Sequence, residues 1–185
     1  MNLPAGPLLT LEPLIDAVRE GVDAAGWSLS GLQKTTSHQF EGRWEGESTR
    51  SAYLFFHRPH GWESVAVDVY LDETSNGLQG SLSLVVESPP LGELGDTEEA
   101  LRRLGAAAAE ALPRRYRTPL SLRVRLEDPA ADPAAAEVEL RFKIRIPRAA
   151  VESGAAAVAD LSATALRAFE RLLEHPGIRG LLVLE

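Results

Sequence analysis

The sequence predicts an α+β domain in two layers, an antiparallel sheet with helices on one face. Apolar residues recur at helical spacing in three separate segments. Between these segments they alternate with polar residues at period two, and Pro, Gly and Asn separate the alternating runs. The expected order is α-β-β-β-α-β-β-α, with three or more strands in the first group. We expect a single α+β domain over residues 1–185, with 1–9 and 176–185 as terminal extensions.

A first amphipathic helix is expected over about residues 10–25. Thr10 can cap its N-terminus, and Pro13 is tolerated because it falls in the first turn. Gly26 stands where helices often end in glycine. The apolar stripe of this helix is Leu11, Leu14, Ile15, Val18 and Val22.

Strands are expected to follow this helix. Alternation is clear over residues 52–56, 65–71 and 78–86, and the turn sequence Ser75-Asn76-Gly77 precedes the last of these runs. A weaker, more polar pattern over residues 27–46 indicates a further strand or hairpin. Alternation with turn residues between the runs predicts antiparallel pairing.

A second helix is expected after the connector at residues 88–96, whose paired prolines cannot continue a strand. Asp96 can cap this helix, with Glu99 returning the bond, and Pro113 ends it. Alanines at 106–109 and 111 permit close approach to the sheet or to a partner helix. The apolar stripe of this helix is Leu101, Leu104, Ala108 and Leu112.

Two more strands are expected over residues 120–126 and 138–146, separated by a loop rich in proline and alanine. A last helix is expected over about 156–174, because its apolar residues return to helical spacing. The sequence HPG terminates this helix. The apolar tail GLLVLE is expected to dock as a short strand.

A row of cations marks the strand in EVELRFKIRIPR. Its apolar residues point to the core, so the cations share the opposite face, and Arg125 is expected near Glu137 or Glu139. This face is either a solvated sheet surface or a binding surface for an acidic partner. We see no aromatic side chain in the outer row to stack on nucleic-acid bases. The candidate partner-binding residues are Arg123, Arg125, Arg141, Lys143, Arg145 and, as a partly exposed aromatic, Trp44.

Composition excludes several functions. The chain has no cysteine, so disulfides and cysteine nucleophiles are ruled out. A net charge of −8 argues against nucleic acid as a direct ligand, although nine Lys/Arg against five Asp/Glu over residues 114–148 give that segment +4. No signal peptide or membrane span is recognisable, so we expect a cytoplasmic protein. Only two of the 19 basic residues are lysine, which is typical of a high-GC bacterial genome.

No catalytic, cofactor or metal site is predicted. The phosphate-loop, dinucleotide, nucleophile-elbow and zinc-helix motifs are all missing. His57 and His60 have ligand spacing but fall at a turn with no third ligand except Glu63. The carboxylates beside Trp44 (Glu41, Glu45 and Glu47) could suggest a glycosidase, and an acidic solvated hairpin explains them as well.

The order of elements resembles the YbjN family and the type III secretion chaperone fold that it shares. The likeness lies in TEEALRRLGAAAAEALPRRYRTPLSLRVRLED, in RFKIRIP, in the closing ALRAFERLLEHPG and in AGW after the first helix. The resemblance implies a non-catalytic protein that binds other proteins and forms a homodimer. The second helix and the strands after it are the implied candidates for the dimer interface. On the helix, the candidate interface residues are Leu101, Leu104, Ala108 and Leu112.

We therefore expect an adaptor or chaperone-like protein that captures a segment of a partner protein without turnover. Three alternatives remain open at this point. A helix closing a curved sheet could enclose a small apolar ligand. An enzyme would need a deep pocket with ionisable groups at His57, His60 or Glu63. DNA binding would require the cations Arg141, Lys143 and Arg145, and it would weaken steeply with salt.

Overall fold

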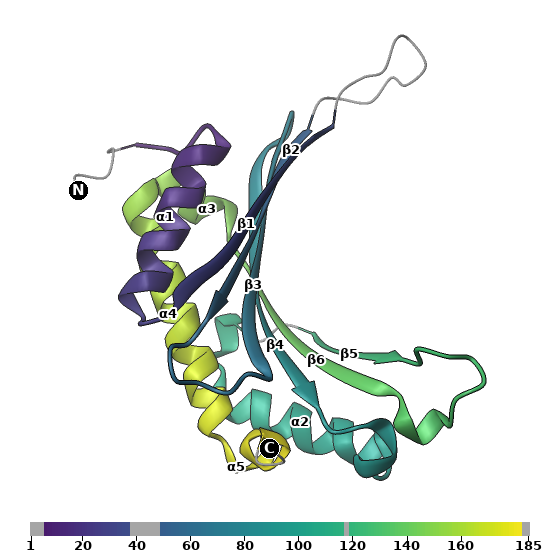
Figure 1. The fold of residues 1–185 in the computed structure, drawn as a ribbon. Helices are drawn as coiled ribbons and strands as arrows, with labels where there is room; N and C mark the ends of the chain where they lie inside the picture. Colours follow the sequence, from purple (N-terminus) through teal and green to yellow (C-terminus); the bar gives the residue numbers. More distant parts are fainter. Residues whose placement is uncertain (1–5, 38–48, 117–118, 183–185) are drawn as a thin grey trace.

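The computed structural model describes residues 6–37, 49–116 and 119–182. Within these residues, one six-stranded antiparallel sheet, in the order β1-β2-β3-β4-β6-β5, has helices on one face only (Figure 1). The predicted α+β class is confirmed. The strands are β1 (Ser28–Ser37), β2 (Thr49–His57), β3 (Val65–Thr74), β4 (Gly77–Ser88), β5 (Leu120–Arg125) and β6 (Glu137–Arg145). The helices are α1 (Leu11–Ala24), α2 (Thr97–Ala111), α3 (Arg148–Ser153), α4 (Ala155–Glu174) and α5 (Pro176–Leu182), with short 3-10 turns at Leu91–Glu93, Arg114–Tyr116 and Pro133–Ala135.

The core lies between the sheet and the helices. Every second residue is buried from Val65 to Leu71 of β3 and along β6, because side chains of a strand point alternately to its two faces. Among the described residues, four strands precede α2, since the first part of the weak pattern over 27–46 forms β1; positions 38–46 of that pattern lie outside the described residues. The largest side chains buried in this layer are Trp27, Phe56, Phe142 and Phe169.

Helices α1 and α4 pack closely because α1 carries a glycine where they meet. A β-carbon on Gly21 would lie 2.1 Å from the carbonyl oxygen of Ala159 and 2.8 Å from Cβ of Ser162. Side chains larger than hydrogen are therefore excluded at this crossing. The first turn of α1 is held differently from the prediction: Thr10 makes no side-chain capping bond, and the Leu11 amide donates to Glu73 Oε2 on β3 at 2.6 Å.

Helix α2 begins as predicted. The Glu99 amide donates to Asp96 Oδ1 at 2.9 Å. The Glu99 side chain does not return the bond, because it pairs with Arg102 on the same helix. Leu104 and Leu112 are buried against the rest of the chain, whereas Ala108 is half-buried.

The C-terminal tail forms a helix, so the prediction of a short strand is wrong. In α5, Ile178 and Leu182 are spaced by four residues and both are buried, which is a helical rather than a strand pattern. At the other end, Leu8 is buried and its amide donates to the carbonyl of Val151 at 3.0 Å. Both terminal extensions therefore contribute to the core.

Candidate functional site

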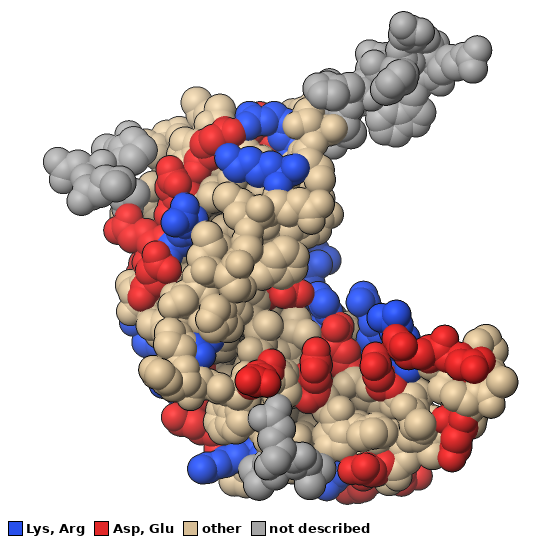
Figure 2. All heavy atoms as spheres, viewed as in Figure 1, with Lys and Arg blue, Asp and Glu red and all other residues tan. Residues whose placement is uncertain are grey.

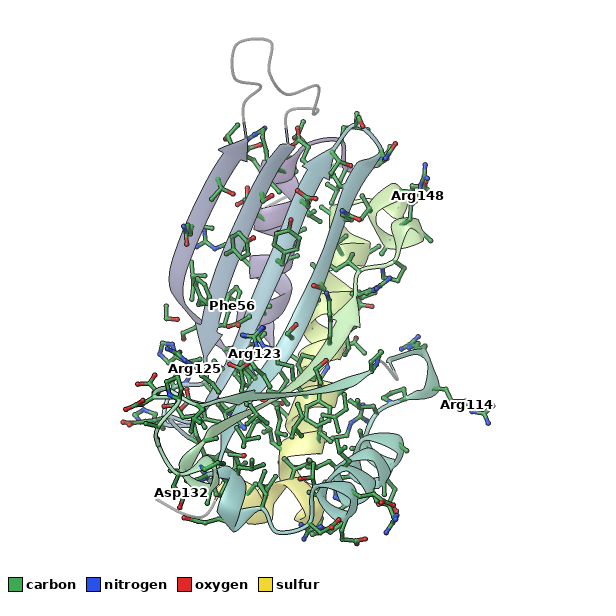
Figure 3. All side chains as sticks on the ribbon, turned by 90° about the vertical axis from the view of Figure 1, so that its right-hand side faces the viewer. Phe56, Arg114, Arg123, Arg125, Asp132 and Arg148 are labelled. Atoms are coloured by element: carbon green, nitrogen blue, oxygen red, sulfur yellow. The ribbon has the colours of Figure 1, made fainter. Side chains whose placement is uncertain are left out.

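The helix-free face of the sheet is the candidate site. Figure 3 shows β1 to β4 standing in front of α1 and α4, with no helix covering the side that faces the viewer. Strand register fixes which side chains are neighbours there. Two rows cross β2, β3, β4 and β6 in turn: Tyr53, Tyr70, Ser81 and Arg145, and beside it Phe55, Asp68, Ser83 and Lys143.

This face is hollowed. The molecule is concave on the side away from the helices, and Lys and Arg atoms face the concavity (Figure 2). One hollow of about 260 Å³ is lined by Phe55 and Arg141, and a second of about 440 Å³ is lined by Arg145. Both include Tyr70, Ser81 and Lys143. We call this continuous depression the open-face groove.

One wall of the open-face groove is aromatic. Tyr53 and Phe55 are 40% and 39% exposed, although large apolar side chains usually lie in the core. The rings of Tyr53 and Tyr70 have centroids 4.9 Å apart and a tilt of 45°. The outer row of β6 itself carries no aromatic side chain, as expected, but the sheet order brings the aromatic residues of β2 and β3 onto the same concave face as β6.

The floor is made of short side chains. Ser81 and Ser83 on β4 are 5% and 8% exposed, and neither hydroxyl forms a hydrogen bond within the described part of the chain. Two inter-strand spacings separate β3 from β6, about 10 Å. Since the residues between them are serines, the space above β4 stays open, and the two hydroxyls line it.

Arg141 organises the base of the groove. Its Nε donates to Glu139 Oε1 at 2.6 Å, and its Nη2 donates to Asp68 Oδ2 at 3.2 Å. Burial raises the pKa of Asp68, and the positive charge of Arg141 partly offsets that rise. The hydrogen bond to Glu139 raises the pKa of Arg141, so this guanidinium stays charged. Arg141 is thus engaged within the chain.

Lys143 and Arg145 differ from Arg141. Both are exposed, and neither has an ion pair or side-chain hydrogen bond with another described residue. They stand two places apart on β6, so both side chains emerge on the groove side. These two cations are the part of the predicted row that is available to a partner.

Arg123 and Arg125 lie outside the open-face groove. They line a separate hollow of about 330 Å³ with Glu137 and Glu139. Register sets Arg123 opposite Glu139, with their charged atoms 3.8 Å apart. Arg125 stands opposite Glu137 as expected, but it pairs with Glu127 at 3.1 Å. Figure 3 places both arginines far from Arg148, at the other end of the sheet.

The remaining candidates are not brought to the groove. Trp44 lies outside the described residues. Of the proposed dimer stripe, Leu104 and Leu112 are already buried within the chain, and Leu101 is 40% exposed. The homodimer stays a prediction, and within this stripe Leu101 and Ala108 are the residues left to form it.

The two histidines remain at a turn. His57 and His60 are exposed, and His60 has a positive φ of 59°. Across residues 6–37, 49–116 and 119–182, no three potential metal ligands gather closely enough to hold an ion. Within the same ranges, no helix combines the length and apolar content of a bilayer span.

The chain was compared with known proteins in three ways. A scan against family models, a search of curated proteins and a search of solved structures each found no match. The resemblance to the YbjN family therefore rests on the segments quoted above.

Tyr53, Phe55 and Tyr70 are the site residues that sequence reasoning missed. A signal existed in the run YLFFH, where both faces of one strand carry large apolar side chains. A strand with one solvated face carries apolar residues on alternate positions only. The apolar residues Tyr53 and Phe55 on the outer face of β2 were therefore the sequence signal of a contact surface.

Proposed function

We propose that this protein is a non-catalytic binding module that holds a segment of a partner protein in the open-face groove. The observation that carries the proposal is the exposure of Tyr53 and Phe55 inside a concave, helix-free sheet face. Exposed aromatic side chains in a hollow are typical anchors of protein contacts. Their burial by a partner segment would supply the free energy of binding.

The dimensions of the groove support this proposal. The walls on β3 and β6 are about 10 Å apart, which suits an extended segment or one face of a helix. Asp68 and Arg141 at the base bind each other, which favours a positioning role over proton transfer. Such a site captures a segment and releases it unchanged.

Site-specific crosslinking tests this function. A photoreactive phenylalanine analogue replaces Phe55 in the groove, and the control carries it at Arg171, an exposed residue of α4. We expect the Phe55 position alone to crosslink one segment of one protein in native lysate. A synthetic peptide of that segment should bind the purified full chain, and Y53S/F55S should abolish this binding. Equal crosslinking from both positions, or a peptide that binds Y53S/F55S normally, would overturn the proposal.

Single-stranded nucleic acid is a second candidate, because exposed rings stand near cations in the groove. The carboxylates of Asp68 and Glu139 lie on the same face and disfavour a chain of phosphates. Fluorescence anisotropy with a labelled oligothymidylate checks this candidate. Binding that is lost in Y53S/F55S and falls steeply with salt would support nucleic acid over a protein segment.

A further inference from the structure

We propose that the open-face groove selects an acidic segment, whose carboxylates bind Lys143 and Arg145 while a neighbouring apolar side chain packs on Tyr53 and Phe55. This inference rests on the proposed function and specifies the chemistry of the partner. It uses an independent observation, the two unpaired cations, whereas the function itself rests on the exposed aromatic residues.

Ion pairing on this face leaves only part of the cation row available. Arg141 bridges Asp68 and Glu139, and Arg123 and Arg125 have acidic neighbours of their own. Neither Lys143 nor Arg145 forms an ion pair or a side-chain hydrogen bond with another described residue. Two like charges two places apart on one strand repel each other, so a bound counter-charge stabilises both.

Spacing favours a peptide with alternate carboxylates. Residues two places apart on β6 are about 6.6 Å apart along the strand. Acidic side chains at alternate positions of an extended segment have the same spacing. Such a segment can therefore reach both cations without bending, and the hydroxyls of Ser81 and Ser83 can donate to it from the floor.

The overall charge of the chain makes this selection specific. The whole protein carries −8, so an acidic segment is repelled by most of the surface. The groove offers local cations inside that negative field. Charge arranged in this way restricts an acidic partner to one place and orientation.

A nucleic acid, with its chain of phosphates, fits the groove less well than a peptide does. Phosphate chains need a continuous run of cations along the path of the strand. Here the carboxylates of Asp68 and Glu139 interrupt the basic surface on the side of Arg141. A peptide with one or two carboxylates needs only Lys143 and Arg145.

The test uses a phage-displayed library of random peptides panned on the purified full chain. We expect the enriched peptides to combine Asp or Glu with a large apolar residue. Binding of a synthetic enriched peptide should weaken at least about tenfold in K143A/R145A. The control R103A/R171A removes two exposed arginines on the helical side, so it matches the change in net charge. It should bind like the unmodified chain.

The outcomes separate this inference from the proposed function. Enriched peptides that lose binding in Y53S/F55S but not in K143A/R145A would overturn the acidic preference and retain the segment-binding function. Peptides indifferent to both double variants, or no enrichment at all, would overturn the function as well. Tighter binding of an oligothymidylate than of any enriched peptide, lost in K143A/R145A, would overturn the acidic segment in favour of nucleic acid.

Discussion

The guanidinium of Arg141 on β6 reaches past β4 and lies 3.2 Å from the carboxylate of Asp68 on β3. The two side chains are about three-quarters buried, and Glu139 holds the other side of the guanidinium. This contact connects the two walls of the open-face groove beneath the space that a partner would fill. Because of this contact, the pKa of Asp68 depends on the burial and charge at the base of the groove.

Asp68 should affect stability in the direction set by its raised pKa. The folded chain holds the proton of Asp68 more tightly than the unfolded chain does, so between its ordinary pKa of 3.8 and the raised value the folded state binds more protons. The contribution of Asp68 to stability therefore falls as pH rises through that window. Relative to D68N, the unmodified chain should gain stability as pH is lowered through this window.

Urea unfolding at a series of pH values measures this difference. R141Q is the informative companion variant, because Arg141 lowers the pKa of Asp68. Removing the positive charge of Arg141 should raise the pKa of Asp68 further, so the pH range over which Asp68 affects stability should extend to higher pH. A carboxyl resonance of Asp68 that titrates at its ordinary value in the folded chain would contradict the prediction.

Truncation of two neighbouring phenylalanines should change the free energy of unfolding by very different amounts. Phe56 is 1% exposed and points into the core, so F56A should lower the free energy of unfolding by about 3–5 kcal/mol. Phe55 points into the groove, and F55A should change it by less than about 1 kcal/mol. Denaturant unfolding of the two variants makes the comparison. Equal losses would mean that Phe55 belongs to the core.

Gly21 should tolerate no side chain. Because a β-carbon there would lie 2.1 Å from the carbonyl oxygen of Ala159, G21A should force α1 and α4 apart and destabilise the fold by about 2 kcal/mol. Gly105 on α2 is the matched control, since a β-carbon there would meet nothing within 4 Å. G105A should raise the free energy of unfolding by up to about 1 kcal/mol, because alanine has a higher helix propensity than glycine. Thermal unfolding of both variants distinguishes the outcomes.

Capping of the two helices should depend on different residues. D96A should destabilise α2 by about 1 kcal/mol, because it removes the acceptor for the Glu99 amide. T10A should have little effect, since Thr10 makes no capping bond. E73Q should weaken α1 more than T10A does, because the Glu73 carboxylate receives the first amide of that helix. Urea midpoints rank the three variants, and a large loss in T10A would contradict the assignment.

Periodicity alone predicted the class of the fold and the extent of most elements. The alternation in β3 and β6 was readable because one face of each strand is packed and the other is not. Asp96, which caps α2, directly precedes that helix in the sequence, so it could be identified from its position. Glu73 could not be identified in this way, since it caps α1 from a strand far along the chain.

The groove could not be predicted from the alternation of apolar and polar residues, because that alternation does not specify the order of the strands in the sheet. Alternation placed Lys143 on an outer face, but it did not say which strand would lie beside β6. The pairing of β4 with β6 sets Ser83 beside Lys143 and brings the aromatic wall near. The resulting division of the cations, with Arg141 engaged and Arg145 available, depends on acidic neighbours from other strands.

The placement of β6 beside β4 has a kinetic consequence. The hairpin of β5 and β6 can form locally, but its docking on β4 must await the closure of a loop that contains α2. Arg141 and Asp68 are 73 residues apart in the chain, so we expect the two walls to meet late in folding. A nascent chain would therefore acquire helices and its first hairpins before it could retain a partner. During refolding, binding of a groove-specific peptide should recover later than the helical circular-dichroism signal. The delay between the two would measure how long β6 takes to dock on β4.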